Sequence, residues 1–420
     1  QNPINFTGGP QTGGANPGSI WFNEQLEHFN LLALSHGGAE GGTAVSALAP
    51  EVGTMGKMYR YETRDRTFHN WTRKEVFSSH SGNGGQWFMG LPRTVDGTPA
   101  PAGSPTHILT SGDGGAFAFG DYHEANDSWV PAPAEWSVSN TASGPDSAWM
   151  ATQNASGRVL NVGWATVCGG ASALTILREL KYDVAHKALV SNPVEELEQL
   201  RTSSLANMTA PISIPAGGSS EIPGTAHNDA AASSDVLITF ELPADGSAVA
   251  FGACVLASSG PRGGGLGQPE VGGPWRPGGL CGDAANSSGV PVLANLSAVD
   301  PEDGTRSGTV SIGVQRLPHP VFITIYKDET EFDMRILVDR CIVEAFVMGG
   351  RHAFTSMGPQ DAHEAGKNPV PSVPGTAMLL MAETAITVKS AQVYSMGCGW
   401  TDPPYIGEGP FTVDGRTVEY

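Results

Sequence analysis

The stretch RILVDRCIVEAFVMGGR, residues 335–351, contains Asp339 and Glu344 in an otherwise apolar run. A retaining glycosidase needs two carboxylates that flank one bond, about 5–5.5 Å apart. In a regular strand, however, positions that differ by an odd number point to opposite faces of the sheet. We therefore expect Asp339 and Glu344 to be sheet-surface or interdomain residues rather than a catalytic pair.

The composition of the whole chain predicts an all-β protein. The chain has 420 residues, 40% of them hydrophobic, with 55 glycines and 31 prolines that separate short apolar runs. A chain of this length exceeds one ordinary core, so two domains are expected. The best helix candidate is the short segment NPVEELEQLR at 192–201. Short runs of β-forming residues bounded by turn formers indicate strands elsewhere.

The charge of the chain argues against nucleic acid and membranes as partners. The formal net charge is −19 at pH 7, and an acidic surface repels phosphate backbones and anionic lipid. No apolar stretch approaches the roughly 20 residues of a membrane span. Neither the histidines nor the cysteines have the spacing of a metal site. We therefore expect no metal and no cofactor.

Seven N-x-[ST] sequons, mostly in turn-like contexts, predict a secreted, extracellular glycoprotein. Their asparagines are Asn5, Asn70, Asn126, Asn154, Asn207, Asn286 and Asn295. Gln1 follows no initiator Met, so we expect the chain to begin where a segment was removed. Among the five cysteines, Cys254 and Cys281 flank a Gly/Pro-rich loop whose base a disulfide could pin. The odd count leaves at least one thiol free or joined to another chain.

The spacing of the strand candidates divides the chain into two domains and a tail. Residues 1–190 repeat short strand candidates separated by loops of Gly, Ser, Asn and Asp, which suits a β-propeller. Residues 191–204 form a linker, and residues 205–397 alternate like a two-sheet sandwich. Residues 398–420 form a tail in which Asp-Gly between β-formers predicts a hairpin. This hairpin either folds back or pairs with an edge strand of another chain.

Several of these segments, in this order, resemble glycoside hydrolase family 32, the family of invertases and fructan hydrolases. ILVDRCIVEAFVMGGR resembles a fingerprint of its C-terminal sandwich, and PVEELEQLR (193–201) resembles its linker. The other matching segments lie at 59–73, 116–131, 148–165 and 386–396. The resemblance implies a five-bladed β-propeller followed by a β-sandwich, with the chemistry in the propeller's central funnel. It further implies that this chain lacks the first blade or so.

The resemblance places three catalytic carboxylates in the propeller, and none is intact here. The stabilising Asp of an Arg-Asp-Pro motif is replaced by the uncharged Asn16 in ANPGSIWF (15–22). The acid/base Glu of a Trp-Glu-Cys-Pro motif is replaced by Phe88 in GGQWFMGLPRTV (84–95), and a phenyl ring transfers no proton. Nothing in residues 1–30 resembles the segment of the nucleophile. Losing preorganised charge at such a site costs about 2.7–4 kcal/mol.

Two hypotheses about function follow. The first is a secreted, catalytically inactive relative, a pseudoenzyme that binds a carbohydrate or is a structural component of an extracellular assembly. Its sugar site would be lined by Asn16, Trp21 and Trp87, although the simpler interpretation is that these tryptophans are blade core. The second is an active β-fructofuranosidase that hydrolyses sucrose or fructans. It would be completed by a separate N-terminal chain that carries the nucleophile.

Overall fold

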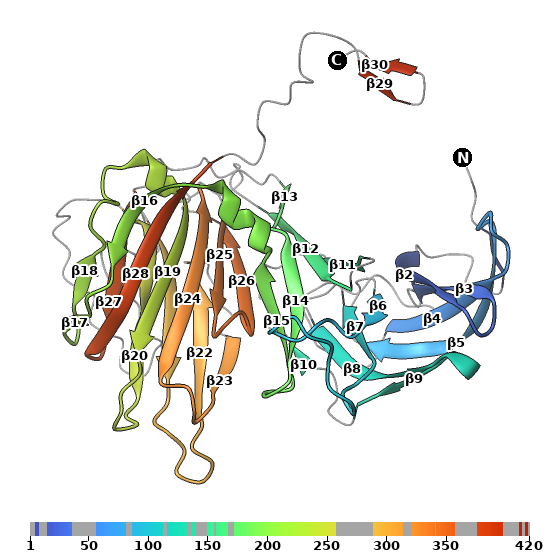
Figure 1. Ribbon diagram of the computed structural model, residues 1–420, viewed down its shortest axis with the longest axis horizontal. Coiled ribbons are helices and arrows are strands. Elements are labelled where there is room, and N and C mark those ends of the chain that lie inside the picture. Colours follow the sequence, from blue (N-terminus) through green and yellow to red (C-terminus); the bar gives the residue numbers. More distant parts are fainter. Residues whose placement is uncertain are drawn as a thin grey trace, which may run out of the picture.

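The computed structural model confirms the all-β prediction: the described residues form small sheets with only short 3₁₀ helices (Figure 1). No helix among them is long and apolar enough to span a membrane. The structure describes residues 5–7, 15–35, 56–80, 86–111, 116–132, 137–138, 149–154, 157–166, 172–257, 289–313, 321–340, 342–357, 376–397, 411–413 and 416–418.

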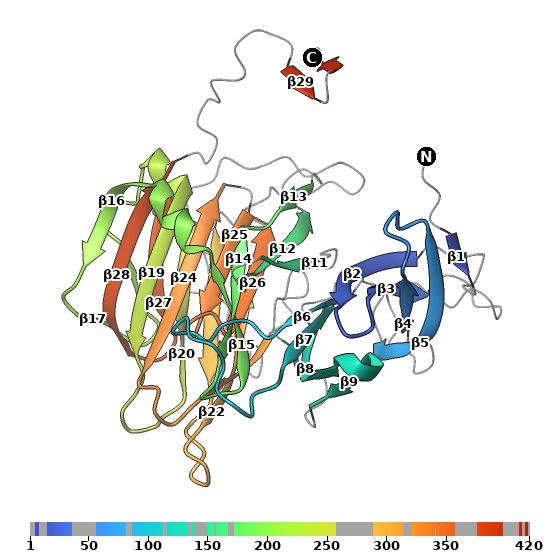
Figure 2. The same ribbon diagram turned by 45° about the vertical axis from the view of Figure 1, so that its right-hand side comes forward.

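Three sheets in the N-terminal half have the form of propeller blades. Their strand orders are β1-β5-β4-β3-β2, β10-β8-β7-β6 with β9 beside β8, and β11-β12-β14-β15 with β13 beside β12. In both views they lie to one side of the sandwich, and the first sheet is farthest from it (Figures 1 and 2). The strands are β1 (Asn5–Thr7), β2 (Ala15–Asn23), β3 (His28–Ser35), β4 (Gly56–Thr63), β5 (Asn70–His80), β6 (Gln86–Gly90), β7 (His107–Ser111), β8 (Ala116–His123), β9 (Ser128–Pro131), β10 (Ser137–Val138), β11 (Trp149–Gln153), β12 (Val159–Thr166), β13 (Ser172–Leu174), β14 (Arg178–Asp183) and β15 (Ala188–Pro193).

The C-terminal half is a sandwich of two sheets. Their orders are β16-β28-β19-β24-β25-β26, with β17 beside β28, and β18-β27-β20-β21-β22-β23. The strands are β16 (Arg201–Met208), β17 (Ile212–Ile214), β18 (Ser219–Glu221), β19 (Ser233–Glu241), β20 (Val249–Ala257), β21 (Val290–Leu296), β22 (Arg306–Ile312), β23 (Val321–Ile325), β24 (Glu331–Asp339), β25 (Ile342–Val347), β26 (His352–Met357), β27 (Ala377–Ala382) and β28 (Ile386–Met396); the 3₁₀ helix η4 spans Asp229–Ala232.

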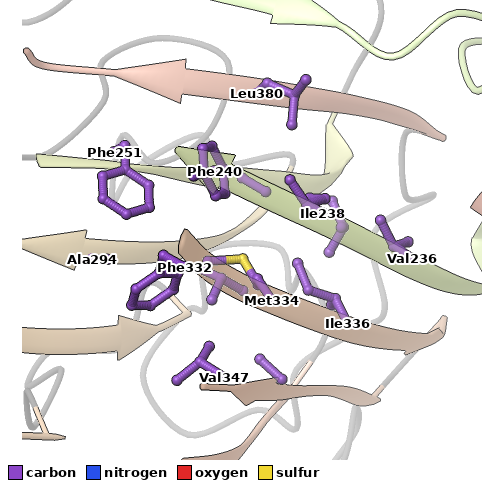
Figure 3. Close-up of a cluster of buried hydrophobic side chains, with 14 of the residues drawn as sticks. Val236, Ile238, Phe240, Phe251, Ala294, Phe332, Met334, Ile336, Val347 and Leu380 are labelled. Atoms are coloured by element: carbon purple, nitrogen blue, oxygen red, sulfur yellow. The ribbon is translucent and has the colours of Figure 1, made fainter. Parts of the chain in front are cut away.

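The core of the sandwich lies between its two sheets (Figure 3). Alternate residues of β19, namely Val236, Ile238 and Phe240, point inward and are at most 2% exposed. The ring of Phe251 on β20 lies 4.5 Å from that of Phe240 and 5.2 Å from that of Phe332 on β24. Burial of such side chains, at about 25 cal/mol per Å² of apolar surface, is the main force that joins the sheets.

The stretch at 335–351 forms a hairpin rather than the single strand assumed from the sequence. β24 ends at Asp339 and β25 begins at Ile342, and these two residues pair in an antiparallel ladder. Arg340 in the turn has a φ of 46°, in the left-handed region that favours Gly or Asn. Because no Asn-Gly or Asp-Gly pair marks this turn, the sequence contains no strong signal for it.

The connection between the two halves is short. β15 ends at Pro193, the 3₁₀ helix η3 spans Glu195–Leu200, and β16 begins at Arg201. β16 pairs with β28 and thus already belongs to the sandwich, so the connection is narrower than the predicted linker, 191–204. In the tail, β29 (Phe411–Val413) pairs with β30 (Arg416–Val418), which confirms the predicted hairpin.

Candidate functional site

The two strands that carry predicted site residues, β2 and β6, lie next to each other. Asn16 lies on β2 opposite Leu34 of β3, and Phe88 lies in the middle of β6. The backbone N–H of Phe88 donates to the hydroxyl of Ser19 on β2, with an N···O distance of 2.6 Å. The structure thus brings Phe88 close to the strand of Asn16. The side chain of Asn16 lies outside what the structure describes.

Phe88 lies in a buried aromatic cluster between the first two sheets, and it is 5% exposed. The ring centroids of Trp21, Phe77 and Trp129 lie 4.9, 5.2 and 5.4 Å from its own. The ring of His107 stacks on it at 4.8 Å with an interplanar angle of 1°. A carboxylate at this position would be surrounded by aromatic rings.

His107 is an aromatic partner rather than a charged one. Burial lowers its pKa to about 4, although the charge of Asp121 acts in the opposite direction. The imidazole is therefore neutral at pH 7. It stacks on Phe88 without bringing a cation into the cluster.

Trp21 and Trp87 are each half-buried and packed against blade cores. The indole N–H of Trp21 donates to the hydroxyl of Tyr122 at 3.1 Å, and its ring packs on Phe88. Trp87 packs against the apolar cluster that joins the second and third sheets. This packing is what the blade-core interpretation expects. Sugar binding by Asn16, Trp21 and Trp87 stays a prediction.

A charged cluster that the sequence analysis did not predict lies between the first and second sheets. At its centre is Asp127, which is 2% exposed and follows the 3₁₀ helix η1, Glu124–Asn126. Five polar side chains from β2, β3, β4 and β8 surround its carboxylate. They are Asn23 (Nδ2, 2.6 Å), His28 (Nε2, 2.8 Å), Asn30 (Nδ2, 3.0 Å), Arg60 (Nη1, 2.9 Å) and Tyr122, whose hydroxyl donates. The cluster therefore holds one blade against the next.

The hydrogen bonds keep Asp127 in its charged form. Burial alone raises the pKa of a carboxyl group. In Asp127 the hydrogen bonds from Tyr122 and Asn23 and the charge of Arg60 outweigh burial, so its pKa lies below the ordinary value. Burial, and then the hydrogen bond to Asp127, raise the pKa of Tyr122. The pair is a neutral phenol that donates to a carboxylate.

Glu62 gives this cluster the composition of a catalytic or metal site. Ligand atoms of His28, Glu62 and Asp127 all lie within 4.8 Å of one another. Two carboxylates near this spacing could serve a retaining glycosidase or a divalent cation. Arg60, however, contacts both: its Nη1 is 2.9 Å from Asp127 and 3.6 Å from Glu62. The guanidinium of Arg60 and the ammonium of Lys74, whose Nζ lies 2.6 Å from Glu62, already balance the two carboxylates, so a metal or a sugar cation could enter only if these side chains moved away.

The sequence contains only a weak signal for this cluster. Asn23, His28 and Asn30 interrupt apolar runs and are 1%, 5% and 0% exposed. Buried polar side chains need partners, but Asp127 lies 104 residues from Asn23 along the chain. Only the packing of neighbouring blades brings them together.

Glu344 links the two halves of the protein, as the interdomain interpretation predicted. Its carboxylate accepts hydrogen bonds from the backbone N–H of Ile176, at 2.6 Å, and from the guanidinium of Arg178 on β14. Arg178 also donates to the hydroxyl of Thr355 at 2.9 Å and is 0% exposed. Asp339, by contrast, is exposed at the end of β24. The two residues form no catalytic pair.

The predicted glycosylation sites that the structure describes with side chains are exposed. They are Asn70, Asn126, Asn154, Asn207 and Asn295. Asn5 lies on β1 with its side chain outside the described part, and Asn286 lies outside the described residues altogether. Cys254 on β20 is disulfide-bonded, while the other four cysteines also lie outside those residues. The predicted pairing with Cys281 therefore stays a prediction.

Comparisons with known proteins identify the fold and one domain of the chain. The family model described as the C-terminal domain of glycosyl hydrolases family 32 matches residues 292–358. Fructan 1-exohydrolase IIa from Cichorium intybus is 16% identical with a TM-score of 0.63, covering 91% of this chain and 71% of that chain. A variant of that enzyme in complex with 1-kestose gives a TM-score of 0.64 at the same identity and coverage. A fructofuranosidase variant from Schwanniomyces occidentalis, complexed with fructosylnystose, is 13% identical with a TM-score of 0.52, covering 91% and 70%.

The shared architecture is thus that of glycosidases with a propeller and a sandwich. Residues 292–358 match the C-terminal domain of glycosyl hydrolases family 32, and the fold is similar to that of the fructan 1-exohydrolase, which confirms the resemblance of the motifs to that family. A search of curated protein sequences found no match.

Proposed function

We propose that this chain is a secreted glycoprotein that has lost hydrolysis and serves as a glycan-binding or structural component of an extracellular assembly. The observation that carries the proposal is the environment of Phe88. The predicted acid/base position holds a buried phenyl ring among aromatic neighbours. No Asp or Glu occurs between Glu75 and Asp96, so no acid stands nearby in the sequence to replace it.

Two features support secretion. Asparagines of five sequons are exposed and thus accessible to a glycosyltransferase. Cys254 is disulfide-bonded, and such bonds persist mainly in oxidising compartments. The Cichorium enzyme was solved with 1-kestose, so a fructose oligosaccharide is the first ligand class to test here.

A second candidate is an active β-fructofuranosidase completed by a separate N-terminal chain. In its favour, Ile20 and Phe22 on the edge strand β2 are 56% and 43% exposed. Exposed apolar side chains on an edge strand form a surface that another sheet could cover. Such a chain could supply a nucleophile, but it would leave Asn16 and Phe88 in place.

Release of fructose from sucrose, inulin and 1-kestose distinguishes the two candidates. We expect no turnover by the purified chain, and turnover comparable with an ordinary invertase would refute the loss of hydrolysis. Mass measurement of the natural material, with and without reductant, would reveal an attached second chain. Titration with 1-kestose, followed by tryptophan fluorescence, tests binding. Two matched variants locate any change in fluorescence on binding. Trp21→Phe, near the predicted site, should remove the change, and Trp164→Phe, away from it, should not.

A further inference from the structure

Phe322 has the largest exposed fraction, 77%, of the big apolar side chains that the structure describes. It lies on β23, the edge strand of the second sandwich sheet. An exposed aromatic ring on an edge strand favours unwanted pairing with another chain. The outer face of this sheet is therefore where a covering group would matter.

The cross-strand neighbours of Phe322 identify such a group. Phe322 pairs with Thr309 of β22, and Thr309 pairs with Asn295 of β21. Directly paired residues of an antiparallel sheet point to the same face. Asn295 is exposed, whereas the adjacent Leu296 is 1% exposed, within the core, so this row faces outward. Asn295 also begins the sequon Asn295-Leu296-Ser297.

We propose that an N-linked glycan on Asn295 lies across Thr309 and packs its first N-acetylglucosamine units on the ring of Phe322. This inference rests on the proposal that the chain is a secreted glycoprotein. Asn295 and Phe322 are separated by two strand spacings, about 10 Å, which an asparagine side chain and its first sugar rings can bridge. The C–H face of each sugar ring packs on the aromatic ring, while its hydroxyl and acetamido groups stay solvated.

Asn207 provides a matched comparison on the other sheet. It is likewise an exposed sequon asparagine on a strand, β16. Its cross-strand partner is Gln392, whose Nε2 lies 3.4 Å from the Asn207 Oδ1. A glycan on Asn207 would therefore meet an amide rather than an aromatic ring.

The test uses the full chain secreted from a eukaryotic host, with site occupancy mapped by enzymatic deglycosylation and mass spectrometry. The first double-mutant cycle consists of Asn295→Gln, Phe322→Thr and the variant with both changes. The control cycle replaces Asn295→Gln by Asn207→Gln and keeps the same change at Phe322. We expect Asn295→Gln to shift the unfolding equilibrium toward the unfolded state by roughly threefold to tenfold when Phe322 is present. The shift should largely disappear in the Phe322→Thr background. Trimming each glycan back to its first N-acetylglucosamine units should preserve the coupling, because these units make the contact.

Four outcomes would overturn the inference. If Asn295 is unmodified while other exposed sequons are occupied, this inference alone fails. The same holds if the effects of Asn295→Gln and Phe322→Thr simply add, or if Phe322 mediates self-association that the glycan does not change. If no sequon is occupied in the secreted chain, both this inference and the proposal that the chain is a glycoprotein fail.

Discussion

Replacing Glu344 by Gln tests how strongly the sandwich is held to the last propeller sheet. The side chains of Arg178 and Glu344 are 0% and 4% exposed. The Gln amide oxygen can still accept from the backbone N–H of Ile176, but the guanidinium loses its counter-charge in a buried place. Removing one partner of a buried ion pair costs about 3–5 kcal/mol. We expect a loss of at least about 3 kcal/mol in the free energy of unfolding, measured by urea denaturation followed through tryptophan fluorescence.

Two controls make this prediction sharp. Replacing both charges, with Arg178→Met and Glu344→Met, should recover much of the loss, because a packed apolar pair can replace a buried ion pair. Glu195→Gln removes the Lys181–Glu195 pair, whose atoms are 3.5 Å apart and whose carboxylate side chain is 84% exposed. It should cause no resolvable change. A Glu344→Gln loss no larger than that of Glu195→Gln would refute the reasoning.

Three further predictions concern the interface between the first two sheets. Asp127→Asn should destabilise the chain by about 3 kcal/mol. Because the pKa of Asp127 is lowered on folding, its stabilising contribution is present above the ordinary carboxyl pKa and is lost as the pH falls through the folded-state value. The melting temperature of the variant should therefore depend less on pH in the acid range than that of the parent. The pKa of His107 falls from 6.5 to about 4 on folding, so the unfolded chain binds its proton first, and stability should decrease from pH 6.5 to 4. His107→Phe should remove that decrease, and an unchanged pH profile of the melting temperature would contradict the assignment. Phe88→Glu should lose about 3–5 kcal/mol through lost packing and release no fructose from sucrose; a variant as stable as the parent would show that Phe88 is not buried as described.

Much of the fold could be predicted from local patterns. In β19 and β24 every second residue, from Val236 and from Phe332 onward, is apolar, and linker and hairpin signals lie where the structure has a short connection and paired strands. The turn at Arg340 could not be predicted in this way, because the residue with the left-handed backbone conformation is neither Gly nor Asn. In the hairpin, Leu337 pairs with Glu344, so Asp339 and Glu344 lie on the same face of the sheet, and the expectation that they point to opposite faces was wrong.

The candidate site was less accessible to sequence reasoning because its contacts are long-range. Phe88 was identified through a motif, but the rings around it come from five other strands, β2, β5, β7, β8 and β9. Arg178 and Glu344 are 166 residues apart, and no local pattern pairs them. Asp127 lies in the connection between β8 and β9, where an acidic residue ordinarily reads as a solvated turn. Its burial depends on a neighbouring blade.

The surroundings of Phe88 also constrain the evolutionary history open to this chain. Five rings, those of Trp21, Phe77, His107, Tyr122 and Trp129, pack around it. An acid at position 88 would be buried among these rings, and it would cost folding stability before it could contribute to any catalysis. An acid could be accommodated at position 88 only if several of these neighbouring positions changed as well.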